Sequence, residues 1–233
     1  MLVVVTREAG RNDSPREWLT PAATILEVPL TTTSYRPVAD VARDLGRVAV
    51  AGPFAVLAVT SARSRDYLEV AWRACAPDAE VWTVGPATSA AVVSAGLAVT
   101  GEARSARALA ERVTRGPVLV LGARAMRDEL PAELTVRGID ARVVACYETV
   151  PVELDEAART ELARADAILI GAPSAWRVAR DAVRPATWVV VPGETTAAAV
   201  RADHPRVLVG WRAEVARRLE DLVAGDRSSQ APQ

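Results

Sequence analysis

The sequence contains no lysine, and its 233 residues include one histidine, His204, and two cysteines, Cys75 and Cys146. Two cysteines are too few for a disulfide framework or a four-cysteine zinc site. A single histidine excludes a multi-histidine metal site and any Ser-His-Asp triad that does not use His204. A phosphate-binding loop needs its lysine, and the sequence has no Gly-x-Gly-x-x-Gly run either. These absences remove several classes of metal and nucleotide site.

The chain also lacks a long apolar run and a large net charge. No stretch approaches the roughly 18 apolar residues that a membrane-spanning helix needs, and the apolar opening Met1–Val5 is too short for a signal peptide. The formal net charge is −1, so nothing argues for general nucleic-acid binding. We therefore expect a protein of the reducing cytoplasm that binds neither nucleic acid nor membrane.

Half of the residues are hydrophobic, which is enough for a sizeable core. Segments with the hydrophobic pattern of a strand alternate along the chain with segments that have the pattern of a helix. Short β-branched runs such as Leu2–Thr6 and Phe54–Thr60 suit buried strands. Between them lie segments such as Ala39–Val50, whose apolar residues recur at helical spacing. Strands and helices that alternate with short connections indicate an α/β fold with a parallel sheet covered on both faces.

An internal repeat runs through this pattern. Residues 55–64 form a strand and a hydroxyl-bearing turn, and residues 166–175 repeat that arrangement. Residues 80–92 form a strand, a Gly/Pro turn and an Ala-rich helix, which residues 188–200 match. Two similar units of this kind predict two α/β lobes.

Two extended, polar, proline-punctuated stretches, Leu30–Pro37 and Glu148–Leu154, separate the similar units. Each alone is equally typical of a surface loop, but together they favour two linkers at which the chain crosses between lobes. Lobe one is then discontinuous, residues 1–33 plus 149–233, and lobe two is the inserted segment 34–148.

The ends of the chain carry two further predictions. Ser14 and Pro15 are typical of a helix start that would carry Trp18 and Leu19 inward. The last helix is expected over residues 214–224, and the polar segment 225–233 is expected to be a disordered tail.

The stretch Glu80–Gly96 has a candidate ligand site at its turn. Gly85–Pro86 breaks the strand, and Thr88 or Ser89 can cap the helix that follows, with Gly96 at its end and a strand starting at Leu97. A helix N-terminus presents unpaired N–H groups that attract a carboxylate or a phosphate. Most such helix starts bind only water, so both interpretations stay open here.

A set of short motifs follows along the chain in a recognisable order: Val4–Arg7, Val59–Arg63, Val84–Ala90, Ser105 with Leu109–Ala110, Cys146–Pro151, Ala172–Ser174 and Thr195–Ala197. Their order and spacing resemble those of the uroporphyrinogen-III synthase family over nearly the whole chain. The resemblance implies two α/β lobes joined by a two-stranded connector, with the ligand cleft between the lobes.

The resemblance also implies a reaction without metal or organic cofactor. The linear tetrapyrrole hydroxymethylbilane loses its terminal hydroxyl and closes through a spiro intermediate, with inversion of the last pyrrole, to uroporphyrinogen III. This substrate carries eight carboxylates, which hydroxyl and N–H groups at helix starts and arginines at strand ends would bind. The residues expected to bind it are Arg7, Ser61, Arg63, Thr88, Ser89, Ser105, Arg124, Ser174, Thr195 and Thr196.

Tyr147 is the expected catalytic residue, because it lies at the end of a strand directly before a proposed linker. A phenol in water has a pKa near 10 and is a poor proton donor, but it can hydrogen-bond the departing hydroxyl. A core tyrosine bonded to a carbonyl is the alternative. The partners expected are the tetrapyrrole and a transient contact with the bilane-forming enzyme, and the protein is expected to be a monomer.

Two of the departures from the family pattern bear on the choice of function. The turn at Gly171–Ala172 carries no hydroxyl where the family has Thr–Ser, and Glu194 adds a negative charge beside an expected anion site. These departures favour an alternative function, a non-catalytic two-lobed sensor that binds a tetrapyrrole or another polyanion.

Overall fold

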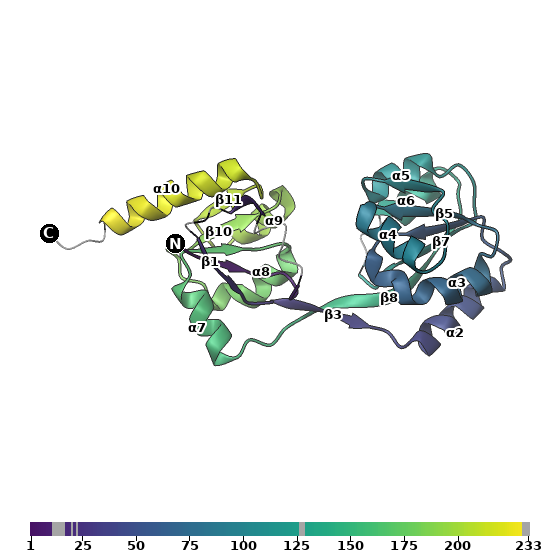
Figure 1. Ribbon diagram of the computed structural model, residues 1–233, viewed down its shortest axis with the longest axis horizontal. Coiled ribbons are helices and arrows are strands. Elements are labelled where there is room, and N and C mark those ends of the chain that lie inside the picture. Colours follow the sequence, from purple (N-terminus) through teal and green to yellow (C-terminus); the bar gives the residue numbers. More distant parts are fainter. Residues whose placement is uncertain (11–16, 20, 22, 126–128, 230–233) are drawn as a thin grey trace. The chain divides into compact units, whose positions relative to one another are not determined.

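The computed structural model describes residues 1–10, 17–19, 21, 23–125 and 129–229, and Figure 1 shows the path of the chain. The chain forms two compact units, residues Met1–Thr32 with Val150–Gln233 and residues Thr33–Thr149. We refer to them below as lobe one and lobe two. The expected helix start at Ser14 lies outside the described residues.

Lobe one is built on a parallel five-stranded sheet in the order β11-β10-β9-β1-β2. Its strands are β1 (Leu2–Val5), β2 (Thr24–Glu27), β9 (Ala167–Leu169), β10 (Trp188–Val191) and β11 (Val207–Val209). Its helices are α7 (Glu156–Arg164), α8 (Pro173–Ala179), the 3-10 turn η2 (Arg180–Ala182), α9 (Glu194–Arg201) and α10 (Ala213–Ser229).

Both faces of this sheet are covered by helices, and its strands are apolar except at Thr24 and Glu27 of the edge strand β2. Val4 packs with Leu162, Trp176 and other residues of α7, α8 and α9 on one face. Val3 and Val5 face the opposite side, where they pack with the α10 residues Val215, Leu219 and Val223. The alternation of side chains along each strand thus divides the core into two layers.

Lobe two has a six-stranded sheet in the order β3-β8-β7-β4-β5-β6. Its strands are β3 (Thr31–Tyr35), β4 (Val56–Val59), β5 (Glu80–Val84), β6 (Gly101–Ala103), β7 (Val118–Ala123) and β8 (Ala141–Pro151). Its helices are α2 (Val38–Ala49), the 3-10 helix η1 (Ala62–Tyr67), α3 (Leu68–Cys75), α4 (Pro86–Ser94), α5 (Ala106–Arg112) and α6 (Glu129–Val136).

The sheet of lobe two is also covered on both faces. Leu57 and Leu119 pack with α2, η1, α3 and α4 on one side. Val56 and Val118 pack with α5 and α6 on the other. The expected α/β fold with parallel sheets is therefore confirmed in both lobes, with β4 to β8 mutually parallel.

Strands β3 and β8 form the two-stranded connector. Val152 N donates to the carbonyl of Leu30 over 3.0 Å, and Arg36 N donates to the carbonyl of Cys146 over 3.0 Å. Because residue numbers rise on one strand as they fall on the other, the pair is antiparallel. Both expected extended stretches are thus paired strands rather than loops.

Two expectations at the level of single elements are wrong. The strand expected from Leu97 begins at Gly101, because Leu97 and Val99 pack onto the core while the Trp82 ring lies against Gly101. A Cβ at Gly101 would come within 2.5 Å of that ring, so only glycine permits this register.

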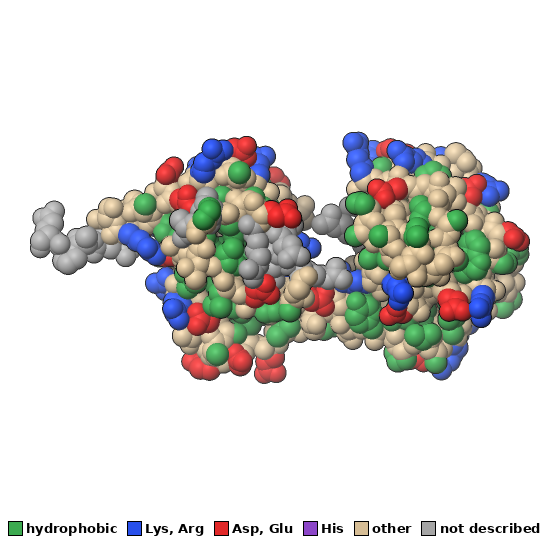
Figure 2. All heavy atoms as spheres, viewed as in Figure 1, with side chains coloured by type: hydrophobic (Ala, Val, Ile, Leu, Met, Phe, Trp, Pro, Cys, Tyr) green, Lys and Arg blue, Asp and Glu red, His purple; other side chains and the backbone are tan. Residues whose placement is uncertain are grey.

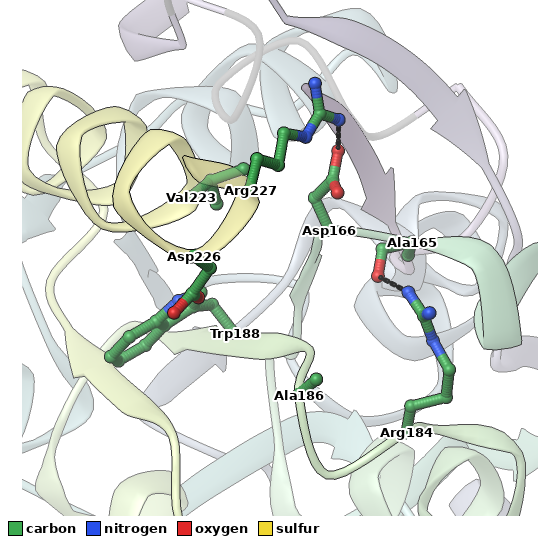
Figure 3. Close-up of a pocket in the computed structure, with 8 residues that line it drawn as sticks. All are labelled: Ala165, Asp166, Arg184, Ala186, Trp188, Val223, Asp226 and Arg227. Atoms are coloured by element: carbon green, nitrogen blue, oxygen red, sulfur yellow. Dashed lines mark hydrogen bonds and ion pairs between the residues drawn. The ribbon is translucent and has the colours of Figure 1, made fainter. Parts of the chain in front are cut away.

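The expected disordered tail is wrong for residues 225–229, which belong to α10. Asp226 accepts from Trp188 Nε1 at 3.2 Å and pairs with Arg206, while Arg227 donates to Asp166 at 2.6 Å (Figure 3). These polar side chains bind the helix end to the amino-terminal edge of the lobe-one sheet, an effect that the polar composition alone does not reveal.

Acidic and basic side chains are interspersed over the face of each lobe that Figure 2 shows. Many form short-range pairs on helices, such as Arg43 with Asp40 at 2.9 Å and Arg73 with Glu69 at 2.8 Å. Among the described helices, none is long and apolar enough to cross a bilayer.

Candidate active site

The carboxyl ends of parallel strands gather at one edge of each sheet, and most of the expected site residues follow those ends. In lobe two, β5 and β6 lie on one side of β4, and β7 and β8 lie on the other. The strand order therefore reverses between β4 and β7, the position at which such sheets bind ligands. Arg63 follows β4, Arg124 follows β7, and Tyr147 lies on β8 opposite Ala123.

Arg63 and Tyr147 meet at this edge. The guanidinium carbon of Arg63 lies 5.6 Å from the centroid of the Tyr147 ring, within cation–π range. The Tyr35 ring lies 6.3 Å from the Tyr147 ring at an angle of 49°, and Tyr147 is only 5% exposed. The carbonyl of Tyr147 accepts from Arg124 N at 2.7 Å. The structure thus brings three expected residues together in lobe two.

The phenol oxygen of Tyr147 makes no hydrogen bond to any residue in the described part of the chain. Tyr67 behaves differently, because its hydroxyl donates to the carbonyl of Arg36 at 2.7 Å and burial raises its pKa. Tyr67 therefore matches the alternative of a structural tyrosine, whereas the hydroxyl of Tyr147 keeps its hydrogen-bonding capacity for a ligand.

Arg36 holds the backbone directly before Tyr147. Its guanidinium donates to the carbonyl of Ala145 at 2.7 Å and to Asp44 at 2.8 Å, and its backbone N–H bonds to Cys146. The hydrogen bond from Arg36 holds the pKa of the Asp44 carboxyl below its ordinary value. Sequence reasoning missed this cluster, since nothing in the spacing places residue 36 beside residue 145.

Cys146 and Ser64 are each adjacent in sequence to one member of the Arg63–Tyr147 pair. Burial raises the pKa of the Cys146 thiol to about 12, opposed in part by the hydroxyl of Ser64. Both side chains are fully buried. Ser61 caps η1 by accepting from Arg63 N at 3.2 Å, which is a structural role for that hydroxyl.

The expectation that Thr88 or Ser89 caps α4 is wrong. Gly85 has a φ of 78°, so the chain turns at once and the helix begins at Pro86. Thr88 is buried and its N–H bonds to Gly85 at 3.1 Å. The hydroxyl of Ser89 contacts Thr83 at 2.7 Å and donates to Glu102 at 2.5 Å.

Of the other helix starts with expected site residues, one has a side-chain cap and two do not. Ser105 caps α5 as expected, accepting from Ala108 N at 3.1 Å, and is exposed. Ser174 and Thr195 lie one residue inside helices that begin at Pro173 and Glu194, with no side-chain cap. Both are exposed, whereas Thr196 is buried. Glycine or alanine in extended conformation precedes each of these helices, so no hydroxyl is needed to start it.

The charge of Glu194 is compensated within its own helix, because its carboxylate accepts from Arg201 at 2.8 Å. Arg124 is similarly engaged, at 3.7 Å from Glu148, and its side chain is 60% exposed. The acidic residue that departs from the family pattern thus carries its own counter-ion.

In lobe one the strand order reverses between β1 and β9. Arg7 follows β1, and its guanidinium carbon lies 5.9 Å from the ring centroid of Trp211, which follows β11. The sequence-based prediction included Arg7 but missed Trp211. An aromatic residue two positions after the strand-like run Val207–Val209 was the signal that could have found it.

A family model described as uroporphyrinogen-III synthase HemD matches residues 22–216, most of the chain. The chain belongs to the uroporphyrinogen-III synthase family. Membership confirms the resemblance drawn from the order of the motifs. No curated protein matches at a significant level.

Solved structures of this family have the same fold. A Thermus thermophilus uroporphyrinogen III synthase variant is 19% identical, with a TM-score of 0.57 and 98% of each chain covered. The Helicobacter pylori uroporphyrinogen-III synthetase is 16% identical, with a TM-score of 0.64, 94% of this chain and 98% of that chain covered. At this identity the likeness shows the fold, so the roles of individual residues depend on the geometry described above.

Proposed function

We propose that this protein is a uroporphyrinogen-III synthase, a lyase that converts hydroxymethylbilane to uroporphyrinogen III. The family match supports the reaction class, and one observation carries the assignment of the site. Tyr147 is buried beside Arg63 at the reversal point of a parallel sheet, with a phenol oxygen that no described residue engages.

The phenol donates a hydrogen bond to the terminal hydroxyl of the substrate. The carbon–oxygen bond then breaks, the hydroxyl leaves as water with a proton taken up from solvent, and the pyrrole nitrogen supplies the electron pair that forms an azafulvenium-like species. The substituted carbon of the last pyrrole attacks the methylene carbon of this species and gives the spiro intermediate. The spiro intermediate rearranges to the inverted ring, and the ring carbon that closes the macrocycle releases one proton to solvent as the pyrrole regains its aromaticity. Because the reactive species forms readily, the protein mainly has to hold the chain in the folded geometry.

Arg63 binds a carboxylate arm of the substrate beside Tyr147. A guanidinium presents several N–H donors in one plane and matches a carboxylate bidentately. Arg7, Arg124 and the hydroxyl or N–H groups at Ser61, Thr88, Ser89, Ser105, Ser174, Thr195 and Thr196 are proposed as further donors. Among these, the hydroxyls of Ser61, Ser89 and Ser105 already bond within the protein, so their share is expected to be small.

The test is the ratio of ring isomers formed when the bilane is generated in the same reaction. Wild-type protein is expected to give the type III isomer, and Tyr147→Phe to lower the rate by about 10- to 100-fold. Its melting temperature should not change, because the hydroxyl bonds to no described residue. If wild-type protein yields only the type I ring that forms spontaneously, the proposed function is wrong.

The sensor alternative has lost one of its supports, since the charge of Glu194 is neutralised by Arg201. Tetrapyrrole binding without turnover would favour it. We further propose a cytoplasmic monomer that meets the bilane-forming enzyme transiently, because free bilane closes spontaneously to the wrong isomer. Sedimentation of the protein with and without that enzyme tests the monomeric state and the contact between the two proteins.

A further inference from the structure

Resting on the proposed function, we propose that the ring of Tyr35 is the aromatic face against which the substrate's hydroxyl-bearing pyrrole stacks. There the ring stabilises the positive charge that develops on this pyrrole as the carbon–oxygen bond breaks. Three features of lobe two support this role: the register of the connector, the exposure of the Tyr35 ring and the compensation of the charges around it.

The register of the connector places Tyr35 directly opposite Tyr147. The carbonyl of Cys146 accepts from Arg36 N at 3.0 Å, so these two residues form a hydrogen-bonded pair of the antiparallel strands. Their neighbours Tyr35 and Tyr147 form the next pair, in which no ladder bond intervenes and both side chains lie on the same face. The two ring centroids are accordingly 6.3 Å apart. A substrate whose hydroxyl contacts the Tyr147 phenol therefore has its pyrrole within reach of the Tyr35 ring.

The Tyr35 ring is far more exposed than its cross-strand partner. Tyr35 is 52% exposed, whereas Tyr147 is 5% exposed. The Tyr35 hydroxyl makes no hydrogen bond to any residue within the described ranges, in contrast to that of Tyr67, which donates to a backbone carbonyl. Because the two rings are tilted by 49° rather than stacked, Tyr35 keeps an open aromatic face. Small-molecule sites are lined largely by apolar and aromatic side chains, so this face suits a flat pyrrole.

The positive charges near the two tyrosines are compensated. Arg36 pairs with Asp44 at 2.8 Å. The guanidinium carbon of Arg63 lies 5.6 Å from the centroid of the Tyr147 ring, and in the proposed function a carboxylate arm of the substrate neutralises it. An aromatic face attracts a cation through its quadrupole, most strongly where water is displaced. A pyrrole that covers the Tyr35 ring displaces that water itself.

The positive charge exists only during the reaction. The hydroxyl leaves as water with a proton from solvent, which leaves one positive charge shared by the pyrrole nitrogen and the methylene carbon. The attacking carbon of the last pyrrole then supplies an electron pair to the methylene carbon, and the charge passes to the attacking ring. The Tyr35 face attracts the charged pyrrole more strongly than the neutral one, so it lowers the barrier more than it tightens substrate binding.

The test is the single-turnover rate of the full chain with freshly prepared hydroxymethylbilane. Tyr35→Leu should lower the rate constant by about 5- to 30-fold, whereas Tyr35→Phe, which keeps the aromatic face, should stay within about twofold of wild type. One, two and three fluorines on the ring of Tyr35→Phe withdraw electrons from its face, so the rate constant should fall with each fluorine. A ring with a merely structural role would not respond to fluorine. Val38→Ala, at a residue that is 44% exposed, removes apolar surface three positions later and should react as wild type does.

Thermal unfolding and equilibrium binding separate folding and affinity from rate. Each variant should melt within about 2–4 °C of wild type, because the half-exposed ring contributes one cross-strand pair. Binding is measured with uroporphyrin III, a stable macrocycle with eight carboxylates. Tyr35→Leu should weaken this binding by about 2- to 10-fold, since a neutral macrocycle ring gains stacking but no cation attraction.

The outcomes distinguish this proposal from the proposed function. Type III product from wild-type protein, with a rate constant that is unchanged in Tyr35→Leu or independent of fluorine number, would overturn the role of Tyr35 alone. If wild-type protein forms only the type I ring, the proposed function fails, and the binding measurement then decides on the aromatic face. Weaker binding of uroporphyrin III to Tyr35→Leu would support that face, and unchanged binding would overturn it.

Discussion

The guanidinium of Arg36 donates a 2.7 Å hydrogen bond to the carbonyl of Ala145, two residues before Tyr147. The strand β3 ends at Tyr35, and Arg36 then bonds to β8 through both its backbone N–H, to the carbonyl of Cys146 at 3.0 Å, and its side chain. Asp44 holds the other side of the guanidinium at 2.8 Å. The position of the proposed catalytic phenol thus depends on an arginine that does not approach the phenol oxygen itself.

We predict that Arg36→Gln lowers kcat by about 10- to 100-fold while KM changes little, because a small misplacement of a reacting group is costly. The free energy of unfolding should fall by about 1–3 kcal/mol, since the Ala145 carbonyl loses a charged hydrogen-bond donor. Steady-state kinetics and denaturant unfolding check both numbers. Arg47→Gln is the control, as Arg47 pairs with the same Asp44 at 2.9 Å from a side chain that is 71% exposed. A rise in KM with an unchanged kcat would contradict a positioning role.

The end of α10 provides a prediction on acid stability. A hydrogen bond from Arg206, and a further one from Trp188, lower the pKa of the Asp226 carboxyl. A carboxyl whose pKa is lowered on folding stabilises the folded state at any pH above its ordinary pKa, which is 3.8. This contribution is lost as the pH falls through the lowered pKa. Asp226→Asn should therefore have a lower melting temperature than wild type at pH 7, and the difference between the two melting temperatures should shrink below about pH 4. Asp221→Asn, which removes an exposed carboxylate from the same helix, is the control measured at the same pH values.

The buried thiol of Cys146 provides the opposite pH dependence. Its pKa is raised from 9.0 to about 12 by burial, so the folded state keeps the thiol neutral. Stability from this effect is complete below pH 9 and is lost as the pH rises toward 12. Denaturant midpoints from pH 8 to pH 11 should fall more steeply in wild type than in Cys146→Ala, which retains Cys75. Iodoacetamide should label Cys146 quickly only in the unfolded chain, and rapid labelling of native protein would refute the inference.

Position 171 should tolerate only a small side chain. Gly171→Ala places a methyl group 3.4 Å from the Trp211 ring, which is ordinary contact, so the free energy of unfolding should change by less than about 1 kcal/mol. Gly171→Thr adds branches that force the ring aside and should lower the free energy of unfolding by about 1–3 kcal/mol. The Trp211→Leu background provides the check, because there the threonine should fit at little further cost. Equal effects of threonine in both backgrounds would disprove the steric coupling.

Helix starts show where local reasoning succeeds and where it fails. Ser105 caps its helix because a serine and the N–H three residues later interact within one turn, and sequence spacing alone describes that geometry. Thr88 does not cap α4, because the positive φ of Gly85 starts the helix two residues earlier. The hydroxyl pattern indicated the helix, but the conformation of one glycine decided which residues begin it.

The amino-acid sequence by itself determined the α/β class, because apolar periodicity sets which faces of each strand and helix must be buried. It also indicated Tyr147 and Arg63 through the order of family motifs. Only the tertiary structure decided that Arg7 meets Trp211, 204 positions later, and that Arg36 bonds to Ala145. Such contacts depend on strand order and on the register of β3 against β8. Local periodicity predicts neither the strand order nor the register, since it does not specify which strand ends become neighbours.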